Sequence, residues 1–158
     1  MQVDIKYTDG VQSVLLDGVD VSGKIRTPEV SMAASNCSAI PYVREKLLSL
    51  QRNIAKAQSV ILDGRDIGTV VLPASEFKFY LTASPEERAR RRYEELKAKG
   101  ESVTYESVLD DVNKRDKNDM TRKIAPLKKS YDATEINSDN MTAEQVIDYV
   151  VGRITEAL

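Results

Sequence analysis

The chain has 158 residues, enough for one ordinary domain with a buried core, and its 23 Lys and Arg against 25 Asp and Glu leave a formal net charge of −2. This balance argues against nonspecific nucleic-acid binding, and the lack of histidine excludes histidine-activated nucleophiles and His/Cys zinc clusters. Cys37 is the single cysteine, so no intramolecular disulfide can form. No apolar run is long enough to span a membrane and no secretory leader is visible, so we expect a cytoplasmic protein with no membrane partner.

The amino-terminal third combines short strands with two helices. Turn residues at Asp9-Gly10 and Asp17-Gly18 separate runs of alternating apolar residues, a pattern typical of antiparallel hairpins. Pro28 and Pro41 each stand in the first turn of a helical segment, where the missing N–H costs nothing. The expected strands cover residues 3–7, 11–16 and 19–21, and the expected helices cover 28–37 and 42–57.

From residue 58 onward strands alternate with helices, which predicts an α/β domain with a parallel sheet. Ser84-Pro85-Glu86-Glu87 and Thr142-Ala143-Glu144-Gln145 each predict a capping box at the start of a helix. Gly100 predicts the end of the first of these helices. The expected strands cover 59–63, 77–81 and 135–137, and the expected helices cover 85–99, 105–121 and 143–158.

One segment matches a nucleotide-binding pattern by accident. Residues 18–24 read Gly-Val-Asp-Val-Ser-Gly-Lys, which fits G-x-x-x-x-G-K. However, Ile25 replaces the hydroxyl residue that would hold Mg²⁺, and Asp20 would place an anion in a loop built for phosphates. We therefore predict a hairpin here, with no helix directly after Lys24.

The most informative segment is Asp63-Gly64-Arg65-Asp66, which follows the apolar residues 60–62. We interpret those apolar residues as a buried strand, and ligands bind at the carboxyl ends of strands in open α/β sheets. The glycine allows a ligand to approach the backbone, while Arg65 offers a donor fork and Asp66 an acceptor. A solvated ion pair on a turn is the simpler alternative.

A second group of charges lies further along the chain. Arg115, Asp119 and Arg122 are spaced i, i+4 and i+7, which places them on one face of a helix. From the spacing alone we favour a surface ladder of salt bridges, each worth about 0.2–0.5 kcal/mol.

Four motifs in fixed order resolve this ambiguity: IRTPEVSMAASNCSAIPYVREKLL at 25–48, DGRDIGTVV at 63–71, ASPEERARRRY at 83–93 and RDKNDMTRKIAPL at 115–127. Together they strongly resemble bacterial cytidylate (CMP) kinases, over nearly the whole chain. The resemblance implies a P-loop-kinase-like three-layer sandwich with a parallel sheet, a small β-hairpin and helical insert that binds the nucleoside monophosphate (NMP), and a helical lid. Residues 1–57 would form the NMP-binding insert, 58–158 the kinase core, and about 105–127 the lid.

Kinases of this family open with a strand, a glycine-rich phosphate-binding loop (the P-loop) and a helix, and this chain begins downstream of that segment. The resemblance therefore implies an incomplete core, without the first strand and the P-loop. We expect little or no turnover from this chain alone. We also expect the open sheet to be completed by self-association or by a complementary amino-terminal segment.

The resemblance also assigns roles to individual residues. It places Ser35, Arg44 and Asp66 at the cytosine, Arg65 at the CMP phosphate, and Arg115, Asp119 and Arg122 on the lid, where the arginines meet phosphate oxygens. Asp66 suits the cytosine amine because a carboxylate accepts from it and repels the O4 carbonyl of uracil. From the residues alone, Arg44 fits a surface partner of Glu45 equally well, and Ser35 fits a small packing residue.

The implied reaction transfers the γ-phosphate of ATP to CMP or dCMP, giving CDP or dCDP in pyrimidine metabolism, with Mg²⁺ bound to ATP. Phosphoryl transfer depends on positioning and cationic stabilisation, so a chain without histidine is compatible with it. The alternative is a catalytically silent CMP-binding module, or half of a split enzyme that needs a complementary chain. The expected partners are CMP or dCMP and ATP.

Overall fold

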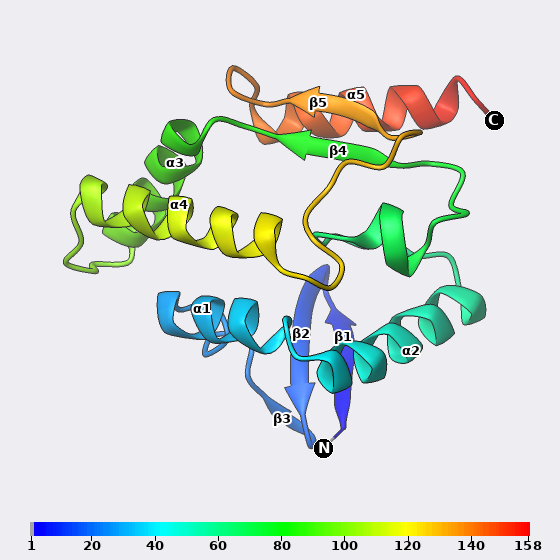
Figure 1. Cartoon of the computed structure of the whole chain (residues 1–158), viewed down its shortest axis with the longest axis horizontal. Coiled ribbons are helices and arrows are strands. Elements are labelled where there is room, and N and C mark those ends of the chain that lie inside the picture. Colours follow the sequence, from blue (N-terminus) through cyan, green and yellow to red (C-terminus); the bar gives the residue numbers. More distant parts are fainter. Residues whose placement is uncertain (1) are drawn as a thin grey trace.

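The computed structural model describes residues 2–158 as a mixed α/β protein with two small sheets. Figure 1 shows the amino-terminal hairpin with α1 and α2 at one end of the molecule and β4, β5 and α5 at the other, with α3 and α4 along one side. Helix α4 runs beside α1, so the lid motif of the sequence lies against the amino-terminal block.

The amino-terminal sheet is antiparallel, in the order β1-β2-β3, with β1 at Val3–Thr8, β2 at Val11–Leu16 and β3 at Val19–Asp20. Both hairpin turns place an aspartate and a glycine in the left-handed region, with φ of 51° and 78° at Asp9 and Gly10 and of 49° and 83° at Asp17 and Gly18. These paired positive φ values match the right-handed twist of the strands, as the sequence predicted.

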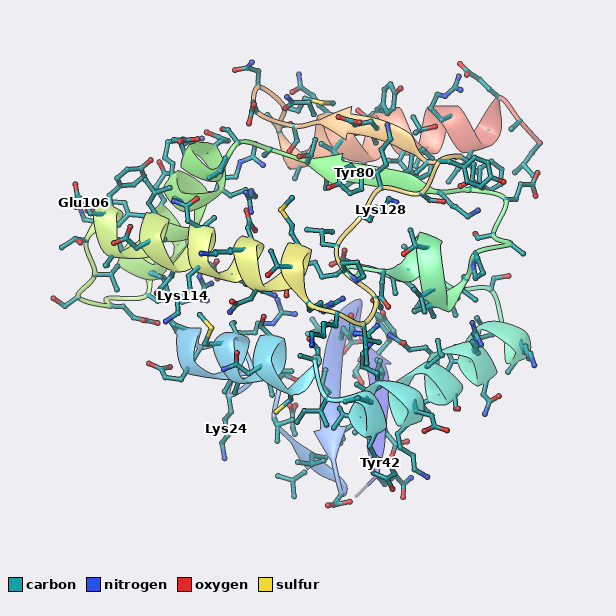
Figure 2. The ribbon with its side chains drawn as sticks, in the orientation of Figure 1. Lys24, Tyr42, Tyr80, Glu106, Lys114 and Lys128 are labelled. Atoms are coloured by element: carbon teal, nitrogen blue, oxygen red, sulfur yellow. The ribbon has the colours of Figure 1, made fainter. Side chains whose placement is uncertain are left out.

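The accidental nucleotide pattern is confirmed as a hairpin and turn. Val19 and Asp20 lie in β3, the next residues form turns, and the first helix starts only at Pro28. Lys24 is exposed and projects away from the ribbon (Figure 2). This segment therefore has none of the strand–loop–helix geometry of a phosphate cradle.

Two helices follow, α1 at Pro28–Cys37 and α2 at Pro41–Ala57. Thr27 caps α1 by accepting from the Val30 N–H, and Pro28 occupies the first turn as predicted. After α2 the chain runs without regular structure to a five-residue π-helix, η1, at Ile67–Val71.

The main apolar core lies between α3 (Pro85–Ala98) and α4 (Tyr105–Thr121). Ala89, Leu96 and Val108 are buried there, and Tyr93 and Tyr105 pack edge to face around them. Gly100 ends the α3 segment with φ of 79°, as predicted. This core fixes the position of α4 relative to α3.

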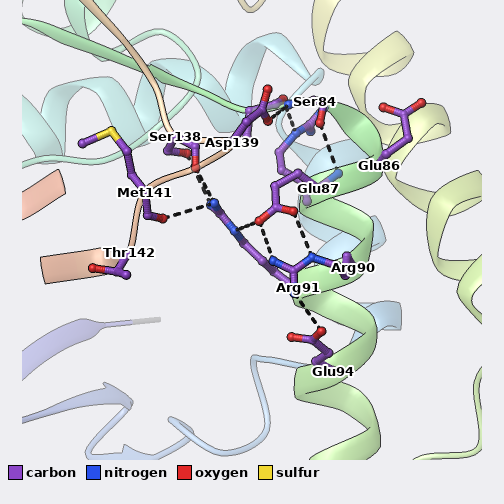
Figure 3. Close-up of polar contacts among 12 residues, drawn as sticks. Ser84, Glu86, Glu87, Arg90, Arg91, Glu94, Ser138, Asp139, Met141 and Thr142 are labelled. Carbon is purple, nitrogen blue, oxygen red and sulfur yellow. Dashed lines mark hydrogen bonds and ion pairs between the residues drawn. The ribbon is translucent and has the colours of Figure 1, made fainter. Parts of the chain in front are cut away.

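The second sheet is parallel and pairs β4 (Phe79–Thr82) with β5 (Thr134–Asn137), and α5 (Ala143–Thr155) follows. Figure 3 shows how α3 is tied to the loop after β5, because Arg91 donates to the oxygens of Ser138 and the carbonyl of Met141. The predicted capping box of Thr142 and Gln145 is confirmed at the start of α5.

The capping box predicted at Ser84 is only half present. The Ser84 hydroxyl accepts from the Glu87 N–H at 3.2 Å, but the Ser84 N–H donates to Asp139 at 2.6 Å. The Glu87 carboxylate instead accepts from Arg90 and Arg91 (Figure 3). The Ser84 N–H is therefore bonded to Asp139, in the loop between β5 and α5, and not to the Glu87 side chain as a capping box requires.

The predicted strand at 59–63 is wrong. These residues have no regular structure, and Ile61 is fully exposed rather than buried. A strand exists through hydrogen bonds to a neighbouring strand, and within residues 2–158 no strand pairs with this segment. Residues 60–62 are apolar, as a buried strand requires, but no described strand forms hydrogen bonds with them.

Across residues 2–158, no helix combines the length and apolar character that crossing a membrane would require.

Candidate functional site

Seven side chains that the sequence singled out converge where α1, α2, the turn before η1 and the end of α4 meet. They are Ser35, Arg44, Arg65, Asp66, Arg115, Asp119 and Arg122. Residues up to 87 positions apart in sequence thus form one connected cluster, organised around two buried carboxylates.

Asp119 is the first of these carboxylates, with only 3% of the residue exposed. Its Oδ1 accepts from the Ser35 hydroxyl at 3.0 Å, and its Oδ2 accepts from Arg65 Nε at 2.9 Å. Arg115 Nε lies 3.8 Å from the same Oδ2. A buried carboxylate needs such partners, and here they join α4 to α1 and to the Arg65 turn.

Asp66 is the second carboxylate, with 8% of the residue exposed. It forms an ion pair with Arg44 Nη2, and its Oδ1 lies 3.7 Å from Arg122 Nη2. Its backbone carbonyl accepts from the N–H groups of Val70 and Val71, which begins η1 directly after the turn. π-Helical turns occur frequently at functional sites.

Arg44 therefore does not act as a surface partner of Glu45. Its Nη1 donates to the Ser38 carbonyl at 3.1 Å while Nη2 contacts Asp66. The same helix face carries Arg52, whose guanidinium donates to the carbonyls of Val70 and Val71 at 2.7 and 3.0 Å. Helix α2 thus holds the Asp66 segment at both ends.

Arg122 follows the last turn of α4, and only 7% of its side chain is exposed. Its Nε donates to the Ala125 carbonyl at 2.6 Å and its Nη1 to the Ser38 hydroxyl at 3.1 Å. Among residues 2–158, neither its buried Nη2 nor the buried Nε of Arg115 has a hydrogen-bond partner. Each lies beside a carboxylate oxygen, Arg122 Nη2 at 3.7 Å from Asp66 Oδ1 and Arg115 Nε at 3.8 Å from Asp119 Oδ2, which is an ion-pair distance but too long for a hydrogen bond. Buried donors without a hydrogen bond are costly, so both nitrogens favour a further acceptor.

The electrostatics of the cluster favour an anion. Burial, followed by the charge of a neighbouring arginine, lowers the pKa of both Arg115 and Arg122, with Arg65 acting on the former and Arg44 on the latter. The cations outnumber the carboxylates in the cluster. Its charged members are four arginines and two aspartates: Arg44, Arg65, Arg115, Arg122, Asp66 and Asp119. A bound dianion would neutralise the excess of two positive charges and relieve the repulsion among the guanidinium groups.

A cavity of about 430 Å³ adjoins the cluster between α1, α3 and α4, within the size range of small-ligand pockets. Arg65 and Arg115 line it from the site, and Arg88 and Arg92 line it from α3. Arg88 binds Asp116 through two parallel hydrogen bonds, of 2.9 and 2.6 Å, which raise its pKa and link α3 to α4. Arg90, on the exposed side of α3, pairs with Glu87 and Glu94, and Arg92 pairs with Glu95 of the same helix.

Two contributors to the site were missed by sequence reasoning. Ser38 contacts both Arg44 and Arg122, and Ala125 presents its carbonyl to Arg122 from a left-handed conformation with φ of 48°. The spacing of Ser35 and Ser38, three positions apart at the end of α1, was the available signal for the first. No sequence signal marks the second, because a non-glycine residue seldom adopts positive φ.

Comparisons with known proteins show which family the chain resembles. The family model described as cytidylate kinase matches residues 1–156. The cytidylate kinase of Caldicellulosiruptor saccharolyticus is 54% identical over 149 residues, covering 94% of this chain and 66% of that protein. The cytidylate kinase of Clostridium acetobutylicum is 49% identical over 145 residues, covering 92% and 67%, and that of Fervidobacterium nodosum is 46% identical over 155 residues, covering 98% and 70%. The chain thus spans about two thirds of the length of these curated relatives.

Proposed function

Since the chain belongs to the cytidylate kinase family, we propose that it acts in the transfer of the γ-phosphate of ATP to CMP or dCMP, giving CDP or dCDP. Its described residues form the acceptor site for the nucleoside monophosphate. Residues 1–57 serve as the NMP-binding insert and residues from about 105 to 127 as the lid, because the cluster lies where these two parts meet.

One observation carries the proposal. Two buried guanidinium nitrogens, Arg115 Nε and Arg122 Nη2, have no hydrogen-bond partner within a cluster that carries excess positive charge. The phosphate of a nucleoside monophosphate brings a charge of about −1.5 to −2 at pH 7 and three acceptor oxygens. The phosphate supplies acceptors for both nitrogens, and Arg65, which is hydrogen-bonded to Asp119, adds a third cation.

Recognition of the base is assigned to Asp66 and to Arg44, which form an ion pair. Asp66 accepts from the cytosine amine and Arg44 donates to the acceptors at N3 and O2, while the Ser35 hydroxyl contributes a further polar contact. The ion pair of Arg44 and Asp66 supports this assignment because it holds a donor and an acceptor side by side, the pattern that the cytosine edge requires. Uracil reverses that pattern at position 4 and leaves Asp66 facing a carbonyl oxygen.

The protein's contribution to the chemistry is positional. Arg115 and Arg122 neutralise phosphate oxygens, and Asp119 orients Arg65 and Arg115 while remaining able to accept from a ribose hydroxyl. Such fixed charges lower the barrier without a proton-transferring side chain, which suits a chain with no histidine.

Mg²⁺ is assigned to ATP rather than to a protein cage. Among the residues that the structure describes, no group of three or more acidic, His or Cys side chains is placed to hold a metal ion. Magnesium commonly keeps several waters and binds through substrate phosphates.

The proposal is tested by isothermal titration calorimetry of the purified chain with CMP, comparing wild type, Arg122→Met and Arg153→Met. Arg153 is a matched control because it is exposed on α5, where it pairs with Glu156 of the same segment. Wild type and Arg153→Met are expected to bind CMP equally, and Arg122→Met at least tenfold more weakly, since a charge-assisted hydrogen bond contributes about 1.5–3 kcal/mol. Absence of CMP binding by the wild-type chain at millimolar ligand would refute the proposal.

A parallel assay of CDP formation with ATP and Mg²⁺ separates binding from transfer. If CDP formation increases in proportion to the protein and is lost in Arg122→Met, the chain alone catalyses the complete reaction. CMP binding without turnover would place the cradle for the ATP phosphates outside residues 2–158.

A further inference from the structure

The amino-terminal antiparallel sheet leaves its first strand, β1, as an open edge. Among residues 2–158, β1 pairs with β2 alone, and every residue of the strand is exposed. An edge strand presents unpaired N–H and C=O groups, which can pair with a strand of another molecule. The strand contributes none of the seven clustered side chains of the candidate site, so its edge is a separate interaction surface.

The pairing with β2 shows which backbone groups face the open edge. The Asp17 N–H donates to the Gln2 carbonyl at 2.9 Å, so these two residues form a hydrogen-bonded pair. Hydrogen-bonded and non-hydrogen-bonded pairs alternate along antiparallel strands, and the register continues without a bulge over the whole of β1. The even-numbered residues therefore bond to β2. The odd-numbered residues turn their N–H and C=O groups toward the open edge, and they are Val3, Ile5 and Tyr7.

One face of this sheet is apolar and largely exposed to solvent. Residues directly opposite one another on paired strands project from the same face. Ile5 is 54% exposed and Tyr7 72% exposed, although both are large apolar side chains. The face consists of Val3, Ile5, Tyr7, Val14, Leu16 and Val19, with Gln12 hydrogen-bonded to the Tyr7 hydroxyl. Pairing along β1 would continue this face into a second molecule and remove part of it from water.

The charges of β1 select one register for pairing with a second copy. A two-fold axis through Ile5 places Ile5 against its own copy and Val3 against Tyr7 on the apolar face. On the other face it places Asp4 of each copy against Lys6 of the other, which forms two opposite-charge pairs. An axis through either neighbouring residue would place Asp4 against Asp4 or Lys6 against Lys6, and like charges directly opposite are destabilising.

We propose that β1 pairs antiparallel with β1 of a second copy of this chain, in the register centred on Ile5. The proposal does not depend on the function proposed above. The Oδ2 of Asp4 accepts from Gln2 Nε2 at 3.0 Å, and a carboxylate has the capacity to accept from a lysine as well. A lysine on an edge strand discourages pairing, but in this register each ammonium meets a carboxylate. Two strands of six residues bury less area than a standard interface, so the dimer is weak, with a Kd between about 1 μM and 1 mM.

Sedimentation equilibrium of the whole chain, from about 10 μM to 1 mM, tests the proposal. Wild type should show a monomer–dimer equilibrium. Asp4→Lys and Lys6→Asp should each self-associate about tenfold more weakly, because each replaces two opposite-charge pairs with two like-charge pairs. Mixing these two variants in equal amounts should restore dimerisation, since each charge on one chain then faces the opposite charge on the other.

Two further variants complete the experiment. The double variant Asp4→Lys/Lys6→Asp exchanges the charges within one chain and should dimerise as wild type does. Lys24→Asp is the matched control, because it makes the same change in net charge as Lys6→Asp at an exposed position after β3, and it should also dimerise as wild type does.

A wild-type chain that stays monomeric up to about 1 mM would leave this face to another occupant and overturn the proposal. A dimer that neither single variant weakens would lie on another surface, which would equally overturn it. Weakened association that neither the mixture nor the double variant restores would contradict the register centred on Ile5.

Discussion

Replacing Asp66 with alanine should narrow the discrimination between CMP and UMP. Asp66 is the buried carboxylate that the proposed function places opposite the cytosine amine, with Arg44 beside it. The substitution removes the acceptor that favours the amine of cytosine and the charge that repels O4 of uracil. CMP should lose affinity, whereas UMP should lose little or gain.

The size of the effect follows from the burial of the site. With 8% of Asp66 exposed, its contact with the base is made with little competing water. A hydrogen bond to a charged group under such conditions contributes about 1.5–3 kcal/mol, which is about a 10- to 150-fold change in the ratio of affinities.

Calorimetric titrations with CMP and UMP on wild type, Asp66→Ala, Asp66→Asn and Asp63→Ala measure this ratio. Asp63 is the matched control because it is an exposed aspartate three positions earlier on the same turn. Asp66→Asn should also narrow the ratio, since its amide N–H can donate to O4 of uracil. The reasoning fails if Asp66→Ala folds and binds CMP but keeps the wild-type ratio of CMP to UMP affinities.

Three further predictions concern stability. Leu96→Ala should lower the free energy of unfolding by about 2–5 kcal/mol, because Leu96 is buried between α3 and α4. Urea unfolding measures this loss, and a value below about 1 kcal/mol would contradict the prediction. Gly100→Ala should cost about 1 kcal/mol in the same assay, since φ of 79° disfavours a Cβ even though open space surrounds the position; an unchanged midpoint would be inconsistent with that conformation. The hydrogen bond from the Ser84 N–H lowers the pKa of Asp139 below its usual 3.8. The ionised Asp139 therefore stabilises the fold fully above about pH 3.8, and this stabilisation is lost as pH falls through the lower pKa of the folded state. Asp139→Asn should therefore melt below wild type at pH 7, with the difference shrinking below pH 3.8, and a difference that persists at pH 2 would oppose this origin.

Local signals in the sequence predicted the helices well. Helix α4 was expected at 105–121 and is observed at Tyr105–Thr121, because the Thr104 hydroxyl caps its start and its apolar residues repeat with helical spacing. The hairpins were equally accessible, since each turn needs two residues that tolerate positive φ. The strand at 59–63 was not, because an apolar run does not reveal whether a neighbouring strand will pair with it.

The site divides in the same way. Spacing placed Arg115, Asp119 and Arg122 on one face, but only the resemblance to a family distinguished them from a surface ladder. Ser38 and Ala125 escaped prediction because they act through a tertiary contact and a backbone carbonyl, which leave little trace in a single sequence. The roles assigned to the seven residues remain predictions, and the substitutions above test those of Asp66 and Arg122.

The most direct test of the central claim is a crystal structure of the chain with CMP. The account predicts the cytosine amine on Asp66, with Arg44 on the adjoining acceptors, and phosphate oxygens within hydrogen-bond distance of Arg122 Nη2 and Arg115 Nε. CMP bound elsewhere, or bound here with those two nitrogens still lacking an acceptor, would contradict it.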